Sequence, residues 1–131
     1  MEGIQGPFCV KANRYLRNVF ENVLINAVKH NENEHVRITV NISRIEREEG
    51  SFLRFEFKDN GMGIPDEKKR RIFEKGANNV ENLRGLGLGL SLVKKLTEMF
   101  GGRIWVEDKV RGKPSRGSNF IIQLPEMDKK K

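Results

Sequence analysis

The sequence predicts one α/β domain, folded in the α+β manner as a two-layer sandwich with a mixed, mostly antiparallel sheet and about three helices on one face. Two segments carry apolar residues at the three- and four-residue spacing of an amphipathic helix. Four others alternate apolar and polar residues, as strands do when one of their faces is buried. The strands come in two neighbouring pairs, with helical segments before and between them. This order favours antiparallel pairing under a layer of helices.

The first half of the chain supplies one helix and one pair of strands. Apolar residues form a single stripe along residues 13–30, and the polar residues 31–34 end that helix. Strict alternation then predicts a half-buried strand over residues 36–42 and a second strand over residues 53–58. The polar segment 46–51 between the two strands is typical of a hairpin turn.

The second half repeats this order after a break rich in glycine. A short helix is predicted over residues 66–74, and a second amphipathic helix over residues 88–100, where a pair of glycines ends it. A strand follows over residues 103–108. A basic loop, residues 109–117, connects it to the last strand, residues 118–124.

Length and composition fit one domain in a reducing compartment. The chain has 131 residues, of which 37% are hydrophobic and 33% are charged. We expect a single domain over residues 1–131, with its core at about 13–125 and a basic tail at 126–131. A single cysteine permits no internal disulfide, and no apolar run is long enough for a membrane helix. The expected location is cytoplasmic, without membrane contact by this domain, although a longer parent protein could carry a membrane anchor.

The run "RGLGLGLSLVKKL" is the most unusual stretch of the chain. Gly85, Gly87 and Gly89 follow the spacing G-x-G-x-G, which matches neither the dinucleotide fingerprint nor the P-loop. A flexible glycine segment that opens a helix still presents the N–H groups of the helix N-terminus to an anion. Leu86 and Leu88 could anchor the loop on apolar surface. The alternative is a connector that binds nothing.

The segment "DNGMGIP", residues 59–65, joins a carboxylate to turn-forming residues. The Asp59 carboxylate could accept a hydrogen bond from an amino group such as that of adenine. Gly61 and Gly63 would let the backbone approach a flat ring closely. Asp-Asn-Gly sequences also form ordinary turns, and that is the alternative here.

One face of the first predicted helix is polar. Asn22, Asn26, Lys29 and His30 lie at i, i+4, i+7 and i+8, which places them on one side of the helix beside the apolar stripe. Asparagine is a poor helix former, so two asparagines in a helix interior indicate a functional role. An amide oxygen suits Mg²⁺, which takes few protein ligands and completes its coordination with phosphates and water. The alternative is a solvated helix face.

Four segments, in this order, resemble the sequence boxes of the sensor histidine kinases. The stretches "ENVLINAVKH", "DNGMGIP", "IFEKG" and "GLGLGLSLVKKL" look like the asparagine, first glycine, phenylalanine and second glycine boxes of that family. The match covers about residues 13–125. The resemblance implies the ATP-binding catalytic domain of such a kinase, with ATP and Mg²⁺ as cofactors and the Bergerat-type fold shared with the gyrase ATPases. This fold agrees with the order of elements predicted above.

The resemblance also implies roles for single residues. Asn26 would coordinate Mg²⁺, and Asn22 and Lys29 would be the catalytic residues. Asp59 would hold the adenine amino group. Phe73 would belong to a mobile lid, which the glycines of the second box would close over the phosphates. The residues implied to bind the nucleotide are Asn22, Asn26, Lys29, His30, Asp59, Gly61, Gly63, Ile64, Phe73, Gly85, Leu86, Gly87, Leu88, Gly89 and Ser118.

The resemblance favours transfer to histidine over hydrolysis. Related ATPases and serine kinases carry a glutamate four residues before the magnesium asparagine, and here that residue is Asn22. Glu21 is adjacent, but one residue turns it ~100° around the helix. Neither His30 nor His35 has the sequence pattern of the family's phosphoacceptor. We therefore expect two partners: a helical dimerisation domain that carries the acceptor histidine, and a response regulator downstream.

The expected function is to bind Mg-ATP and to supply the γ-phosphoryl group for autophosphorylation of that histidine in two-component signal transduction. A stand-alone ATPase or serine kinase of the same superfamily is the alternative. The net charge of +7 and the basic segments 68–71 and 109–116 also suit a nucleic-acid-binding module. These segments lack interleaved aromatic residues and any named nucleic-acid motif, so no nucleic-acid partner is expected.

Overall fold

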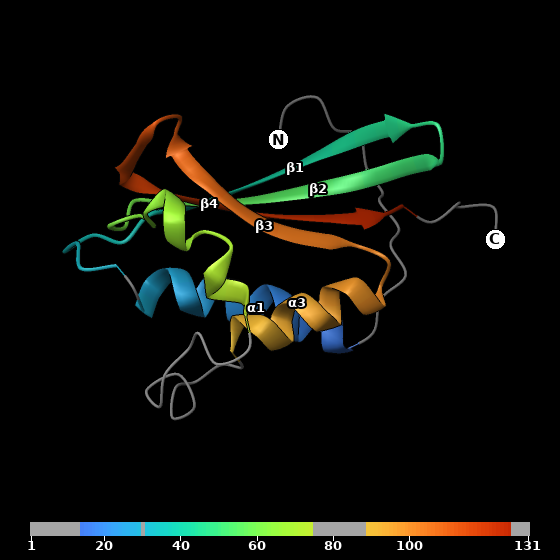
Figure 1. Ribbon diagram of the computed structural model, residues 1–131, viewed down its shortest axis with the longest axis horizontal. Helices are drawn as coiled ribbons and strands as arrows, with labels where there is room; N and C mark the ends of the chain where they lie inside the picture. The colour runs from blue at the N-terminus through green and yellow to red at the C-terminus, as the bar shows by residue number, and fades with distance from the viewer. Residues whose placement is uncertain (1–13, 30, 75–88, 127–131) are drawn as a thin grey trace.

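The computed structural model describes residues 14–29, 31–74 and 89–126, and the chain forms two layers, a sheet and a set of helices on one of its faces (Figure 1). The predicted two-layer sandwich is confirmed. Within these ranges, none of the helices is long and apolar enough to cross a membrane. The elements in chain order are α1 (Arg14–Lys29), β1 (Ile38–Arg47), β2 (Gly50–Asp59), the 3₁₀ turns η1 (Asp66–Lys68) and η2 (Arg71–Phe73), α3 (Leu90–Met99), β3 (Arg103–Val110) and β4 (Lys113–Pro125).

The sheet has the strand order β1-β2-β4-β3, and each pair of neighbouring strands is antiparallel. Phe57 of β2 lies beside Phe120 of β4, which in turn lies beside Val106 of β3. Because successive residues of a strand point to opposite faces, the same face recurs at every second residue. The apolar residues of these rows therefore face the helices together.

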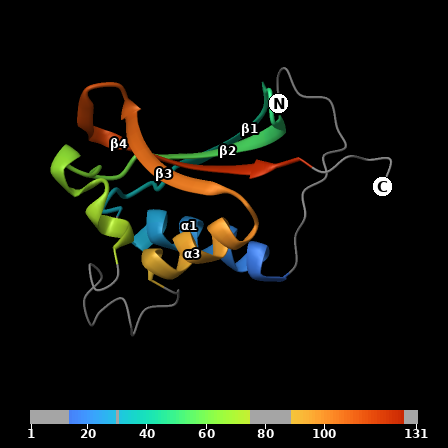
Figure 2. The same ribbon diagram turned by 45° about the vertical axis from the view of Figure 1, so that its right-hand side comes forward.

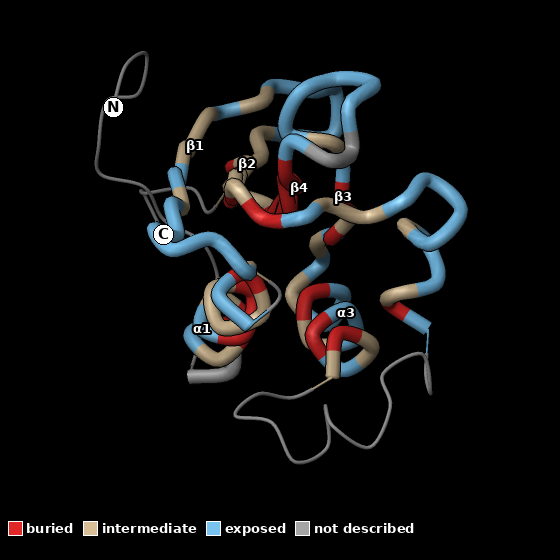
Figure 3. The backbone as a smooth tube through the Cα atoms, turned by 90° about the vertical axis from the view of Figure 1, so that its left-hand side faces the viewer, coloured by how far each residue is buried: buried red, intermediate tan, exposed pale blue. Residues whose placement is uncertain are grey.

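The core lies between this face of the sheet and the two helices α1 and α3. The apolar stripe of each helix is turned toward the sheet, and Figure 3 shows buried residues in both helices and along β4. Phe20 of α1 packs against Phe55 of β2 with ring centroids 4.9 Å apart. Full burial of a large apolar side chain, as for Phe57 and Phe120, contributes about 1.5–3 kcal/mol. The buried core residues are Leu16, Val19, Val23, Phe57, Phe73, Leu90, Val93, Ile104, Val106, Phe120, Ile122 and Leu124.

Both hairpins are longer than the sequence predicts. β1 continues to Arg47 and β4 begins at Lys113, so much of the predicted polar turn and basic loop is paired strand. Strand pairing uses backbone hydrogen bonds, and the face of the sheet away from the helices accepts polar side chains. The charged residues at these strand ends therefore looked like loop residues in the sequence. The predicted helix over residues 66–74 is two 3₁₀ turns instead. The four consecutive basic residues 68–71 repel one another, and so short an α-helix is marginal in any case.

Candidate functional site

Asp59 ends β2 and supplies the buried carboxylate of the candidate site. The residue is 5% exposed. Its Oδ1 accepts two backbone hydrogen bonds, from the N–H of Gly61 at 2.9 Å and from the N–H of Ser118 at 3.2 Å. Within the described residues, no hydrogen bond engages Oδ2. One carboxylate oxygen therefore fixes the orientation of the side chain, and the other can accept a hydrogen bond from a ligand.

Gly117 makes this arrangement possible, although the sequence analysis assigned it no role. A Cβ atom on Gly117 would lie 2.1 Å from the backbone carbonyl oxygen of Asp59, and the residue has a φ of +117°. Both features require glycine. The sequence held one signal for this role of Gly117, namely its place directly before the predicted strand at Ser118. A glycine in or beside a strand often marks the close approach of another backbone segment.

The predicted polar face of α1 runs from the core to the surface. Asn22 is buried, and its amide donates to the carbonyl oxygen of Asn18 at 2.7 Å. Asn26, one turn later, is half-buried, and its side chain makes no hydrogen bond to the rest of the described chain. Lys29 is exposed in the last turn. The Asn26 amide thus stands between a buried amide and a surface ammonium, where a ligand can reach it.

Asparagine side chains fix the end of α1 against the turn that follows β2. The Oδ1 atom of Asn60 accepts from the Asn31 amide at 2.7 Å and from the backbone N–H of Arg37 at 3.0 Å. The Asn60 amide donates to the carbonyl oxygen of His35 at 2.9 Å, and the Asn33 amide donates to the carbonyl oxygen of Asn60. This network, which the sequence analysis did not foresee, holds the α1–β1 connection beside the end of β2.

The chain after β2 forms a wall of the site and packs on the core. Gly61 is buried, Gly63 has a φ of +79°, and Ile64 packs against the core cluster. Phe73, at the end of η2, is 8% exposed and meets Phe120 edge-on with ring centroids 6.1 Å apart. The expected role of Phe73 in a mobile lid stays a prediction. Its ring is part of the core, where it removes apolar surface from water.

Gly89 directly precedes α3. Its carbonyl oxygen accepts from the N–H groups of Leu92 and Val93, and no side chain in the described ranges caps the helix. The first N–H groups of a helix have no partner within it, so this end of α3 suits an anion. The other residues predicted for the site lie outside the described residues, and their roles stay predictions: His30, Gly85, Leu86, Gly87 and Leu88.

A lysine and two aspartates join this wall to the edge of the sheet. The ammonium of Lys69, between η1 and η2, lies 2.7 Å from Oδ1 of Asp108 on β3 and also contacts Asp66. Burial acts to lower the pKa of Lys69, but hydrogen bonds to Asp108 and Asp66 outweigh it, so the pKa is raised. Asp108 lies opposite Ser118, whose N–H holds Asp59. The sequence analysis considered the basic segment 68–71 only for nucleic-acid binding and missed this contact.

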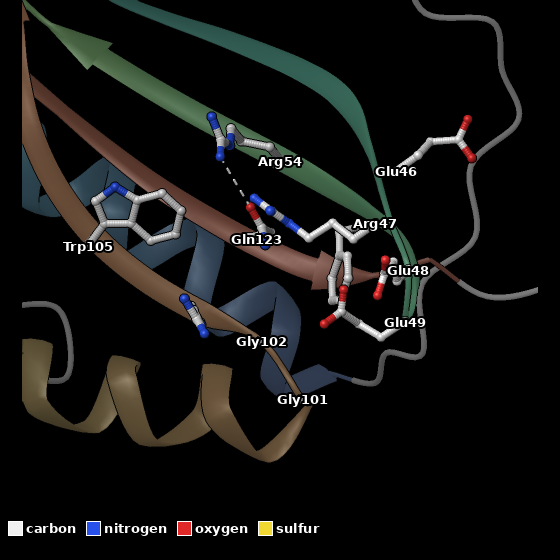
Figure 4. A pocket seen from close by; sticks show the side chains of 11 residues that line it. Glu46, Arg47, Glu48, Glu49, Arg54, Gly101, Gly102, Trp105 and Gln123 are labelled. Carbon is white, nitrogen blue, oxygen red and sulfur yellow. Dashed lines mark hydrogen bonds between the residues drawn. The ribbon is translucent and has the colours of Figure 1, made fainter.

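A separate groove lies on the other face of the sheet. It has a volume of about 930 Å³ and lies beside the β1–β2 hairpin and the start of β3 (Figure 4). The Arg54 guanidinium lies 5.6 Å from the centre of the Trp105 ring and donates to the Gln123 side chain at 3.3 Å. Trp105 is also the cross-strand neighbour of Ile121, which is 1% exposed. No predicted site residue lines the groove.

The predicted site residues that the structure describes gather at one end of the sandwich. Figure 2 shows the end of α1, the start of α3, the turn after β2 and the β3–β4 hairpin on the same side of the molecule, as does Figure 1. Across the described ranges, no cluster of three His, Cys, Asp or Glu residues could hold a metal ion by itself. The arrangement offers a buried carboxylate for a donor group, and an amide, an ammonium and a helix N-terminus for an anion.

Comparison with known proteins gives consistent matches. Residues 12–128 match the family model described as histidine kinase-, DNA gyrase B-, and HSP90-like ATPase. The sensor histidine kinase AruS of Pseudomonas aeruginosa is 42% identical over 118 residues, which are 86% of this chain and 11% of that protein. The mycobacterial sensor histidine kinase MprB superposes with a TM-score of 0.71 at 26% identity, covering 89% of this chain and 74% of that one. Full-length ShkA in complex with AMPPNP superposes with a TM-score of 0.61 at 30% identity, covering 85% of this chain and 21% of that one.

Proposed function

The chain belongs to the family of histidine kinase-, DNA gyrase B- and HSP90-like ATPases, and on that premise we propose that it binds Mg-ATP and supplies the γ-phosphoryl group for phosphorylation of a histidine. The chain spans 11% of the length of its relative AruS, a sensor histidine kinase. We therefore place the acceptor histidine on a separate dimerisation domain and a response regulator downstream of it.

The Asp59 carboxylate carries this proposal. Its Oδ1 is taken by the N–H groups of Gly61 and Ser118, and Oδ2 can accept from a ligand. The amino group of adenine is such a donor, and a hydrogen bond to a charged group contributes about 1.5–3 kcal/mol. The structural relative ShkA was solved with AMPPNP, which supports a nucleotide as the ligand.

The phosphates would lie between α1 and the start of α3. Lys29 offers a positive charge at the end of α1, and the N–H groups that follow Gly89 offer hydrogen-bond donors. The Asn26 amide oxygen fits Mg²⁺, which needs few protein ligands where phosphates and water complete its coordination. When bound, Mg²⁺ would neutralise part of the negative charge of the triphosphate. The role left to the protein is to position the phosphates and to offset their charge, on which phosphoryl transfer mainly depends.

The face of α1 favours a histidine over water as the acceptor of the phosphoryl group. Asn22 stands one turn before Asn26, and an amide cannot take a proton from water. Glu21 has a side chain that is 53% exposed, and it pairs with Arg17 at 3.7 Å. Among the described residues of α1, Glu21 is the only carboxylate, and it lies off the predicted site face. An imidazole is nucleophilic without such a base.

Calorimetric titration of the chain with Mg-ATP tests the proposal. Asp59→Asn keeps an oxygen for the N–H groups of Gly61 and Ser118, but it places an NH₂ donor where Oδ2 would meet the adenine amino group. We expect saturable binding by the wild type and an affinity about ten- to a hundredfold lower in Asp59→Asn. Mg-GTP should bind more weakly than Mg-ATP to the wild type, because guanine has a carbonyl in place of that amino group.

Glu67→Gln is the matched control. Glu67 is exposed in η1, and its loss changes the net charge by the same amount, so the affinity should stay within about twofold of wild type. A wild type without saturable heat contradicts the proposal. So does an Asp59→Asn variant that binds as tightly as the wild type.

A further inference from the structure

We propose that Lys69 is a positioning residue of the nucleotide site, whose ion pair with Asp108 fixes the segment from Gly61 to Phe73 as a wall of that site. The inference rests on the proposed function, because the position of the wall has a measurable effect only if a nucleotide binds beside it. This inference gives a functional role to Lys69, which lies outside the four sequence boxes of the family.

The contact with Asp108 is shielded from solvent. The side chain of Lys69 is 17% exposed and that of Asp108 is 10% exposed, whereas that of Asp66, the second partner, is 82% exposed. Exposed ion pairs contribute little to stability, so the contact with Asp108 is the one that fixes the lysine. Among the ion pairs of the described residues, it is the only one that joins the segment after β2 to the sheet.

Asp108 belongs to the row of residues that orders the carboxylate of the site. It lies opposite Ser118 on β4, and the N–H of Ser118 donates to Oδ1 of Asp59. Displacement of Asp108 would therefore also shift β4 at Ser118, whose N–H orients the Asp59 carboxylate. The ion pair ties the wall to this strand pair and not to a remote part of the surface.

The segment has a second anchor in Phe73, which packs on Phe120 of β4. The regular structure near the two anchors consists of two 3₁₀ turns of three residues each: η1 ends directly before Lys69, and η2 ends with Phe73. Such short turns are not stable on their own. Their position, and with it that of the backbone after Gly61, depends on the contacts of Lys69 and Phe73 together with the core contact of Ile64.

A direct role of Lys69 gives a different expectation. A lysine that touched a phosphate, or that only added to the positive field of the site, would attract the nucleotide more strongly once the competing charge of Asp108 was removed. A positioning residue loses its anchor when either partner is changed. Neutralising the aspartate therefore separates the two roles, because it raises the net charge but removes the ion pair with Lys69.

Calorimetric titration of this chain with Mg-ATP provides the test, on Lys69→Met, Asp108→Asn and the double variant. We expect each single variant to bind about three- to tenfold more weakly, and the double variant to lose no more than the worse single one, since all remove one contact. Lys69→Arg keeps the cation and should recover most of the affinity. Melting curves by circular dichroism set a temperature at which every variant is folded.

Two control variants make the same changes of charge as Lys69→Met and Asp108→Asn, but at exposed residues close to Lys69 in the sequence. Lys68→Met and Glu67→Gln should each stay within about twofold of wild type. The proposal is overturned if Asp108→Asn binds as tightly as wild type or tighter, or if Lys69→Met loses no more than Lys68→Met. These results would leave the nucleotide site itself intact. A wild type that does not bind Mg-ATP at all overturns both this inference and the proposed function.

Discussion

At the scale of single residues, two backbone segments meet so closely beside Asp59 that only glycine fits between them. A Cβ atom on Gly117 would lie 2.1 Å from the carbonyl oxygen and 3.0 Å from the carbonyl carbon of Asp59. Gly112, in the turn of the same hairpin, also has a positive φ, of +76°, but no other atom lies within 4 Å of its Cβ position. Gly112 therefore needs glycine only for its backbone conformation, whereas Gly117 needs it also because a side chain would have no space.

Alanine substitutions at these two glycines should therefore differ. Gly112→Ala should lower the free energy of unfolding by about 1–2 kcal/mol, the cost of a left-handed backbone, and should leave nucleotide affinity unchanged. Gly117→Ala should lower it further, because its Cβ must displace Asp59, and should weaken Mg-ATP binding by about tenfold or more. Urea unfolding and calorimetry measure both effects. Equal losses of stability, or an unchanged affinity in Gly117→Ala, would contradict the assigned role of Gly117.

At the scale of elements, hydrogen bonds from one side chain join the end of α1 to the end of β2. Asn60 accepts from the Asn31 amide and from the backbone N–H of Arg37, and its own amide donates to the carbonyl oxygen of His35. The α1–β1 connection has no regular secondary structure between residues 31 and 37. Its position beside the site therefore depends on this asparagine.

Removal of the Asn60 side chain should loosen that connection alone. In Asn60→Ala, the N–H of Arg37 loses its acceptor and should exchange with solvent faster, and the free energy of unfolding should fall by about 1–3 kcal/mol. Amides in the β3–β4 ladder should lose no more protection than the fall in the global free energy of unfolding accounts for. Asn41→Ala is the control, because the Asn41 side chain makes no hydrogen bond within the described chain. Hydrogen exchange followed by NMR would refute the role of Asn60 if Arg37 kept its wild-type protection.

Local patterns predicted the helices well and the contacts between elements poorly. The stripes predicted helices over residues 13–30 and 88–100, and the structure has Arg14–Lys29 and Leu90–Met99, because an amphipathic stripe is a property of neighbouring residues. The pairing of β2 with β4 joins strands far apart in the chain, which no local pattern encodes. The site divides in the same way. Motifs predicted Asp59 as a site residue, whereas the contacts of Gly117 and Lys69 depend on the assembled sheet and could not be predicted from them.

At the scale of the whole molecule, the proposed division of the reaction between this chain and another domain depends on one face of α1. The position one turn before Asn26 holds the buried amide of Asn22, and the neighbouring Glu21 turns to solvent and to Arg17. Since one residue along a helix rotates the side chain by ~100°, Glu21 cannot reach the place from which a base would act on water. The chain therefore offers a site for ATP but no described base for its hydrolysis.

The chain alone should therefore bind Mg-ATP without releasing phosphate at a measurable rate. Mixed with γ-labelled ATP and a helical dimerisation domain that carries the proposed acceptor histidine, it should transfer label to that histidine, seen as an acid-labile and base-stable phosphoryl group. Glu21→Ala should alter neither result, and Asn26→Ala should abolish the transfer because it removes the proposed magnesium ligand. Phosphate release that Glu21→Ala abolishes would identify this glutamate as a base and make the chain a stand-alone ATPase. Release that persists in Glu21→Ala would point to a base outside the described residues of α1, and in either case the acceptor could no longer be assigned from the face of this helix.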